Sequence, residues 1–192
     1  TRSGCATHEP SKPIPASRSL PTTNDTASGN WVAWATRSKT LTCVKAFLTR
    51  ENINDVVRGA GFAGTIDLLS IDVDGNDYHL WEALACVEPR VVVIEYNAYA
   101  PPPLRWIMPY VSDYQWTGTD TYFGASLASM EALGKRKGLR LVGCDVVGLN
   151  AFFVREDLCG EHFADGNAET FWHPRRWWLD RAFPKGQRVP FD

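Results

Sequence analysis

Carboxylate and amide side chains follow one apolar run of this chain at close spacing. Residues 65–77 read TIDLLSIDVDGND, and four polar side chains end the run: Asp72, Asp74, Asn76 and Asp77. Because side chains alternate along a strand, Asp72 and Asp74 should lie on the same side of it. Their oxygens could act as a base toward a hydroxyl group or bind Mg²⁺ or Ca²⁺. We therefore expect catalytic or metal-binding chemistry here, with Asp72, Asp74 and Asn76 as candidate metal ligands.

A second apolar run ends in the same way. Residues 90–97 read RVVVIEYN, so Glu95 and Asn97 follow a predicted strand as Asp72 and Asp74 do. The carboxyl ends of parallel strands share one edge of a sheet, and ligands bind there. Asp72, Asp74, Glu95 and Asn97 are thus the candidate catalytic residues. A structural alternative stays open, in which Asp77 caps the next helix while Asp72 and Asn97 hold neighbouring loops.

The elements that would position these groups alternate along the chain. We predict a strand at 42–48, a helix at 49–58, the strand of residues 65–73, a helix from Asp77, the strand of residues 90–97, and a helix at 126–137. Strands at 139–144 and 151–155 should then form a hairpin. The fold class is α/β, with a mostly parallel sheet and an antiparallel hairpin edge. The continuous apolar run at 68–73 predicts a strand covered on both faces.

The segment between the second strand and the helix at 126–137 is long and aromatic. Residues 100–123 begin with a proline run and lack helical or strand periodicity, which is typical of a lid over the sheet edge. Five aromatic residues could form an acceptor wall or simply pack the loop: Trp106, Tyr110, Tyr114, Trp116 and Tyr122. His79 is a candidate base, although a histidine one turn into a helix more often faces solvent or caps a neighbour.

Composition indicates an ordinary globular domain. The chain has 192 residues, 44% of them hydrophobic, and a formal net charge of -2, so a nucleic-acid partner is not expected. No apolar run approaches the roughly 20 residues of a membrane helix, so no transmembrane segment is expected. The five cysteines are widely spaced and odd in number, which favours reduced thiols and a reducing compartment. The first residue is Thr1, and we consider an organelle interior as one location.

Both ends of the chain differ in composition from its centre. We predict an extended tail or linker at 1–40, an α/β domain at 41–160, and an aromatic and basic extension at 161–192. Both tails are expected to contact other protein subunits. The candidate interface residues are Trp31, Trp34, Trp172, Trp177 and Trp178.

Several motifs together resemble the carboxyl half of FkbM-type methyltransferases. They are IDVDGND at 71–77, VIEYN at 93–97 and GASL at 124–127, followed by residues 138–154. The resemblance covers roughly residues 41–158. It implies a Rossmann-like sheet whose last two strands form an antiparallel edge, and S-adenosylmethionine as the cofactor. It also implies a first strand ending in a glycine-rich cofactor loop, and no such G-x-G strand precedes Leu41. The amino-terminal strands are therefore expected to be missing or replaced.

Two functions follow from this pattern. The favoured hypothesis is a non-catalytic, methyltransferase-like accessory or structural subunit of a larger assembly, with no cofactor. The alternative is an active S-adenosylmethionine-dependent O-methyltransferase whose amino-terminal half lies outside this sequence.

Overall fold

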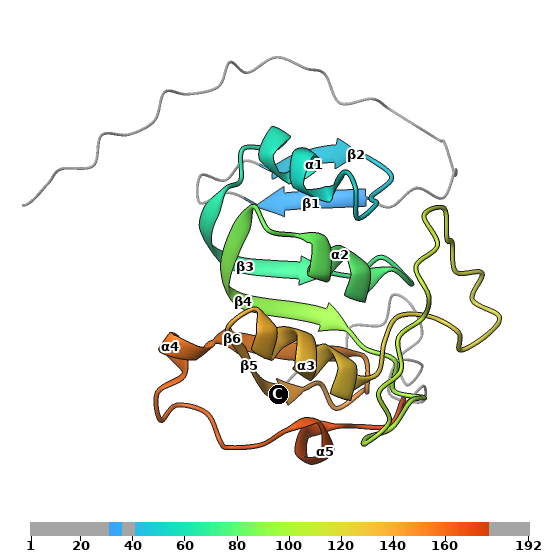
Figure 1. The fold of residues 1–192 in the computed structure, drawn as a ribbon, viewed down its shortest axis with the longest axis vertical. Coiled ribbons are helices and arrows are strands. Elements are labelled where there is room, and N and C mark those ends of the chain that lie inside the picture. The colour runs from blue at the N-terminus through green and yellow to red at the C-terminus, as the bar shows by residue number, and fades with distance from the viewer. Residues whose placement is uncertain (1–30, 36–40, 177–192) are drawn as a thin grey trace, which may run out of the picture.

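Four strands form the central sheet of the domain. The computed structural model describes residues 31–35 and 41–176, with side chains from Cys43 onward (Figure 1). The strand order is β3-β4-β6-β5, with β3 at Gly64–Ile71, β4 at Val87–Glu95, β6 at Asn150–Arg155 and β5 at Leu139–Cys144. The α/β class and the antiparallel hairpin edge are confirmed. The prediction of a mostly parallel sheet is wrong for the described strands, because β6 runs antiparallel to both neighbours and only β3 and β4 pair in parallel.

A separate hairpin precedes the sheet. Strands β1 (Trp31–Ala35) and β2 (Leu41–Lys45) pair antiparallel in a two-stranded sheet of their own. The strand predicted at 42–48 therefore exists, but it does not join the four-stranded sheet. Trp31 and Trp34 lie in β1, and their side chains are outside the described part of the structure, as is the tail at 1–30.

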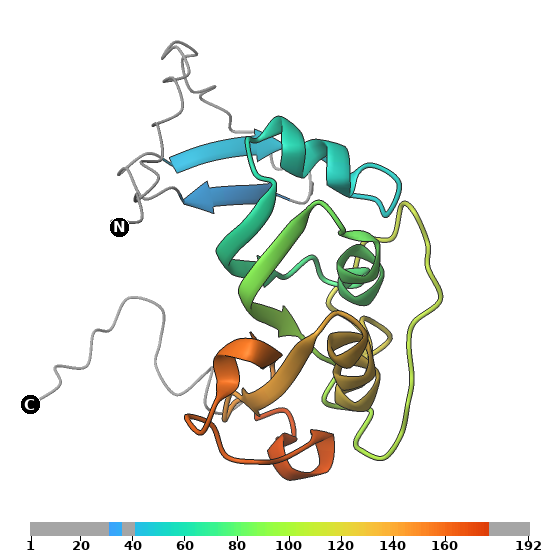
Figure 2. The same cartoon turned by 60° about the vertical axis from the view of Figure 1, so that its left-hand side comes forward.

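Three helices lie on the same side of the sheet. They are α1 (Ile53–Gly59), α2 (Asp77–Ala83) and α3 (Leu127–Arg136), and Figure 2 shows them on one face of the strands. Leu69 of β3 and Ile94 of β4 face this layer and are buried. The Trp81 ring of α2 packs against the Phe153 ring of β6 with centroids 5.0 Å apart. The hydrophobic core therefore lies between these helices and one face of the sheet.

The other face of β3 is open. Leu68 is 57% exposed, whereas its neighbours Leu69 and Ile71 are buried. Successive strand residues point to opposite faces, and the helices cover only the face of Leu69 and Ile71. The prediction that both faces are covered is wrong at Leu68 for this reason.

Helix α3 begins and ends as its sequence predicts. The side chain of Ser126 accepts a hydrogen bond from the backbone N–H of Ser129, which satisfies one free donor of the first turn. Lys135 and Arg136 occupy the last turn, where a positive charge suits the helix dipole. Gly138 follows with φ of 74°, a conformation that glycine adopts without strain.

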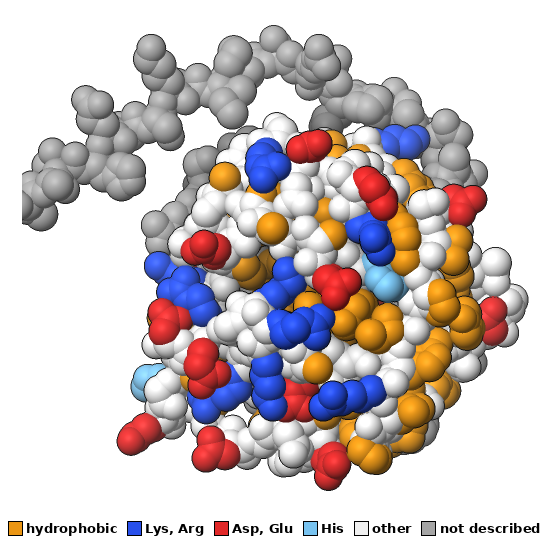
Figure 3. All heavy atoms as spheres, in the orientation of Figure 1, with side chains coloured by type: hydrophobic (Ala, Val, Ile, Leu, Met, Phe, Trp, Pro, Cys, Tyr) orange, Lys and Arg blue, Asp and Glu red, His pale blue; other side chains and the backbone are white. Residues whose placement is uncertain are grey.

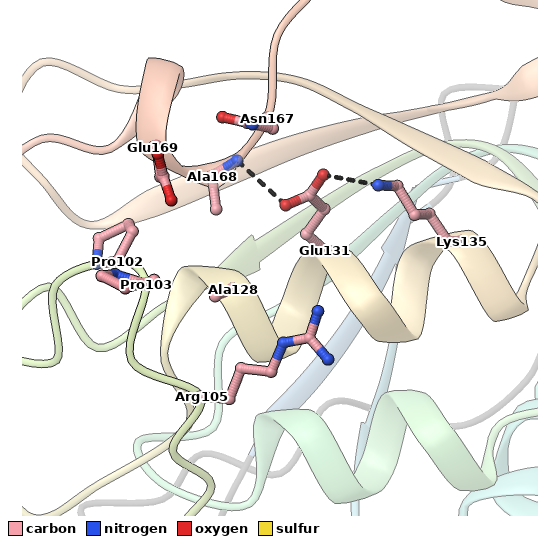
Figure 4. A pocket seen from close by; sticks show the side chains of 9 residues that line it. All are labelled: Pro102, Pro103, Arg105, Ala128, Glu131, Lys135, Asn167, Ala168 and Glu169. Atoms are coloured by element: carbon pink, nitrogen blue, oxygen red, sulfur yellow. Dashed lines mark hydrogen bonds and ion pairs between the residues drawn. The ribbon is translucent and has the colours of Figure 1, made fainter.

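Part of the predicted carboxyl-terminal extension packs on the domain. It contains α5 (Ala168–Phe171), while α4 (Glu156–Cys159) ends just before it. Glu131 of α3 accepts a hydrogen bond from Ala168 N at 3.0 Å and pairs with Lys135 at 3.0 Å, across a hollow of about 270 Å³ (Figure 4). Trp172, a candidate interface residue, is partly buried against the core of its own domain, and its contact with another subunit stays a prediction. Trp177 and Trp178 lie outside the described residues.

The sequence predicted reduced thiols and no transmembrane segment. The four described cysteines, Cys43, Cys86, Cys144 and Cys159, are free thiols. Among the helices that the structure describes, none has the length and apolar character to cross a bilayer.

Candidate functional site

Three carboxyl groups meet in a pocket at the carboxyl ends of β3 and β4. Oxygen atoms of Asp72, Asp74 and Glu95 all lie within 4.8 Å of one another. The pocket has a volume of about 220 Å³. It is lined by Asp72, Asp74, Glu95, Tyr96, Ala98, Tyr99, Trp116, Phe123, Gly148, Leu149 and Arg175. The two parallel strands thus bring together three of the four predicted catalytic residues.

Burial and neighbouring charges favour the protonated forms of Glu95 and Asp72. Burial raises the pKa of Glu95 to about 9, and the charges of Asp77, Asp72 and Asp74 raise it further, while Arg175 opposes them. Burial, and then the charge of Asp74, also raises the pKa of Asp72. Within the described residues, no hydrogen bond or ion pair engages the side chains of Asp72, Asp74 or Glu95. Glu95 is therefore a neutral hydrogen-bond donor at pH 7, and Asp72 is a stronger base than an ordinary aspartate.

Asp77 fixes the loop that carries Asp72 and Asp74. This carboxylate is 1% exposed and accepts hydrogen bonds from the backbone N–H groups of Val73 at 3.0 Å and Gly75 at 2.9 Å. Burial raises its pKa to about 6, although the two hydrogen bonds act in the opposite direction. Asp77 was expected to cap the next helix. It is instead the first residue of α2, and it fixes the loop before that helix.

The same loop contains an unusual backbone turn. Asp74 has φ of 52°, a left-handed conformation that aspartate tolerates better than most residues. Gly75 has φ of 153°, and a Cβ added there would collide with the Tyr114 ring. A glycine is required at this position for both reasons, so the DG pair of the motif places Asp74 beside Asp72.

Asn76 and Asn97 are both buried and both contact the loop at 100–123. Asn76 Nδ2 donates to Val111 O at 2.8 Å, while its Oδ1 has no partner among the described residues. The role of Asn76 as a metal ligand stays a prediction. Asn97 Nδ2 donates to the carbonyls of Thr121 and Phe123, both at 2.8 Å, and its Oδ1 accepts from Tyr99 N. Asn97 therefore serves as a loop anchor and does not line the pocket.

The loop at 100–123 supplies one wall of the pocket. Trp116 lines it together with Phe123, and the two rings pack 5.2 Å apart. The other predicted wall residues fold the loop on itself or dock it: Trp106 packs on Tyr122 at 5.5 Å, Tyr114 donates to Tyr122 O, and Tyr110 donates to Glu51. His79 Nε2 lies 2.7 Å from Met108 O, so it donates to this loop and is not a base in the pocket.

Sequence reasoning missed Tyr99 and Arg175 as pocket residues. Arg175 lies in the segment that was expected to be a separate extension. That segment is held by Tyr96, whose hydroxyl donates to His173 O at 2.9 Å, and by Arg176 N, which donates to Val147 O at 2.8 Å. Gly148 allows the approach, because a Cβ there would collide with the backbone of Pro174. Pairing between aromatic and arginine residues at 171–178 was the available signal.

The residues that line the pocket offer hydrogen-bonding groups and aromatic surface. Carboxyl groups, one arginine and aromatic rings can hydrogen-bond and enclose a polar molecule. Asp72, Asp74 and Glu95 could also hold a hard divalent cation, which would have to displace the proton of Glu95. The described strands do not include one that ends in a glycine-rich loop at a helix start. The glycine-rich cofactor loop that the resemblance implies is therefore not found among the described strands.

The chain was compared with family models, with curated proteins and with solved structures, and no match was found in any of the three.

Proposed function

We propose that this domain is the acceptor-binding half of an S-adenosylmethionine-dependent O-methyltransferase of the FkbM type, built on a Rossmann-like sheet. The observation that carries the proposal is the open pocket in which Asp72, Asp74 and Glu95 meet without hydrogen bonds to the rest of the described chain. Carboxylates that served only the fold would be engaged by backbone or side-chain donors, as Asp77 is.

Each carboxyl group has a defined task in this proposal. Asp72, with its raised pKa, accepts the proton of the acceptor hydroxyl. Glu95 is protonated at neutral pH and donates a hydrogen bond that orients the acceptor. Trp116 and Phe123 exclude water from one side. The described residues supply the acceptor side in this proposal, and none of them is assigned to the methyl donor.

The edge position of β3 supports the same proposal. β3 is the first strand in the order β3-β4-β6-β5, and Leu68 on its open face is 57% exposed. Additional strands with a cofactor loop would extend the sheet at this edge, and the helices that connect them would cover the face of Leu68.

A non-catalytic accessory subunit is the second candidate, and exposed apolar side chains favour it. Figure 3 shows hydrophobic atoms along one margin of the molecule. The exposed residues of the loop that starts after β4 include Tyr99, Leu104, Ile107, Val111 and Tyr122. Such a surface suits contact with another protein subunit.

Calorimetric titration with S-adenosylhomocysteine separates the two candidates. For the natural protein at its full length, the methyltransferase proposal predicts binding with a dissociation constant in the micromolar range. If a folded protein shows no heat of binding at millimolar ligand, the accessory function is the one that remains.

A further inference from the structure

A second pocket opens at the opposite ends of the strands, away from the carboxylate pocket. Its volume is about 340 Å³, within the range of about 300–1,000 Å³ that is typical of small-molecule sites. The amino-terminal ends of β4 and β5 and the carboxyl-terminal ends of α2 and α3 surround it. The carboxylate pocket described above lies at the other ends of β3 and β4, so the two sites share no residue.

The inner wall of this pocket is apolar. Leu69, Trp81, Leu84 and Leu139 line it, and each is at most 4% exposed. These side chains belong to the hydrophobic core, so the pocket reaches down to the core between α2 and α3. An alkyl chain that entered it would remove apolar surface from water on both sides of the contact.

One cationic group at the rim has no carboxylate partner. Lys137 Nζ donates to the backbone carbonyl of Leu84 at 2.9 Å, and no ion pair of Lys137 occurs among the described residues. Burial lowers the pKa of Lys137, and the charge of Glu82, which is itself ion-paired with Arg136, opposes this only in part.

The other charges around the pocket compensate one another. Arg136 pairs with Glu82 at 3.1 Å, and Arg155 pairs with Asp157 at 2.6 Å. Glu88 is exposed and lies near enough to Arg155 for their charges to interact. Among the described charged groups around the pocket, Lys137 is therefore the cation without an ion-pair partner.

We propose that this pocket binds a small apolar carboxylate, such as a medium-chain alkyl acid. The carboxylate forms an ion pair with Lys137, and the alkyl chain packs against Trp81 and Leu84. The ligand supplies the ion-pair partner that Lys137 lacks among the described residues, while the apolar wall selects against small hydrophilic anions such as acetate. The inference does not depend on the proposed methyltransferase function.

The test is a titration of the full chain with sodium octanoate and with octan-1-ol, followed by amide and indole nitrogen–proton NMR spectra. Shifts at the Trp81 indole and the Gly138 amide report on this pocket. We expect saturable binding of octanoate at these signals. Lys137→Gln should weaken octanoate binding about tenfold and leave octanol binding unchanged, since only the acid uses the charge.

Two variants serve as controls. Lys135→Gln removes a charge from α3. Lys135 pairs with Glu131 and does not line this pocket, so octanoate should bind this variant as it binds the native chain. Ala85→Phe fills the mouth from an exposed position and should weaken both ligands. The proposal is overturned if octanoate at a concentration of about 10 mM shifts no pocket signal. It is also overturned if Lys137→Gln and Lys135→Gln change the affinity for octanoate equally.

Discussion

At the scale of single residues, burial and hydrogen bonding set the protonation of each carboxyl group. Asp77 is buried with two backbone N–H donors, and it fixes the loop. Glu95 is largely withdrawn from water without such donors, so its pKa rises to about 9 and it keeps its proton at neutral pH. Asp72 lies nearer to solvent and has the smaller perturbation, which leaves it able to accept a proton. Similar acids therefore have different tasks because of their surroundings.

Glu95→Gln should change how stability depends on pH. The pKa of Glu95 is about 9 in the fold and near 4.5 when unfolded, so the native state keeps a proton that the unfolded state loses. This contribution is present in full below pH 4.5 and is lost as the pH rises to about 9. Glutamine resembles the protonated acid, so the variant should be more stable than the native chain at pH 8, by at least about 1 kcal/mol. Urea unfolding at pH 5 and pH 8 measures this; equal effects at both values would contradict it.

Asp77→Asn should destabilise the domain. The amide can accept from only one of the two N–H groups and presents a donor to the other, at a cost of about 1–3 kcal/mol in the free energy of unfolding. Urea unfolding at pH 8, where Asp77 is ionised, gives the value. Asp55→Asn, an exposed change on α1, should be within about 0.5 kcal/mol of the native chain.

At the scale of elements, the parallel pairing of β3 and β4 sets the position of the site. The helix at 126–137 and the hairpin were predictable from the sequence, because they follow from periodicity and turn residues. Asp72, Asp74 and Glu95 were predicted together because two apolar runs end in acids. The separate β1–β2 pair, the open face at Leu68 and the docking of Arg175 were not predicted, since they depend on contacts between distant segments.

Gly134→Ala in α3 should destabilise the domain even though alanine favours helices. A Cβ at Gly134 would lie 2.7 Å from the Phe153 ring, so the helix would have to move away from β6. We expect a loss of about 1–3 kcal/mol in the free energy of unfolding, measured by urea denaturation. Gly59→Ala in α1 is the matched control, because a Cβ there meets no atom within 4 Å and should be neutral or stabilising. The same effect in both variants would refute this account of the packing.

Glu131→Gln tests whether α5 belongs to the folded unit. Glu131 accepts from Ala168 N and pairs with Lys135, and its side chain is only 13% exposed. Glutamine keeps the size but loses the charge, so hydrogen exchange at Ala168 should accelerate about tenfold while the exchange of β4 amides stays unchanged. Unchanged exchange at Ala168 would show that this contact does not hold the segment.

At the scale of the whole molecule, the two ends of the strands differ from each other, and so do the two faces of the sheet. The carboxyl ends of β3 and β4 carry the carboxylate pocket, with the aromatic loop of residues 100–123 beside it (Figure 1). One face is covered by helices, and the other is open at Leu68. We proposed above that additional elements pack against this open side. This side also leaves apolar surface for an additional subunit or segment.

The most direct test of the central claim is methyl transfer from tritium-labelled S-adenosylmethionine to a panel of hydroxyl compounds, measured with the natural protein at its full length. The native protein should transfer the label, and Asp72→Asn should lower the rate about 100-fold or more, because the proton acceptor is lost. Asp67→Asn, an exposed change on β3 whose residue pairs with Arg90, should retain the native rate. A native protein that transfers no label, or an Asp72→Asn variant as active as Asp67→Asn, would contradict the proposal that Asp72, Asp74 and Glu95 form a methyl-acceptor site.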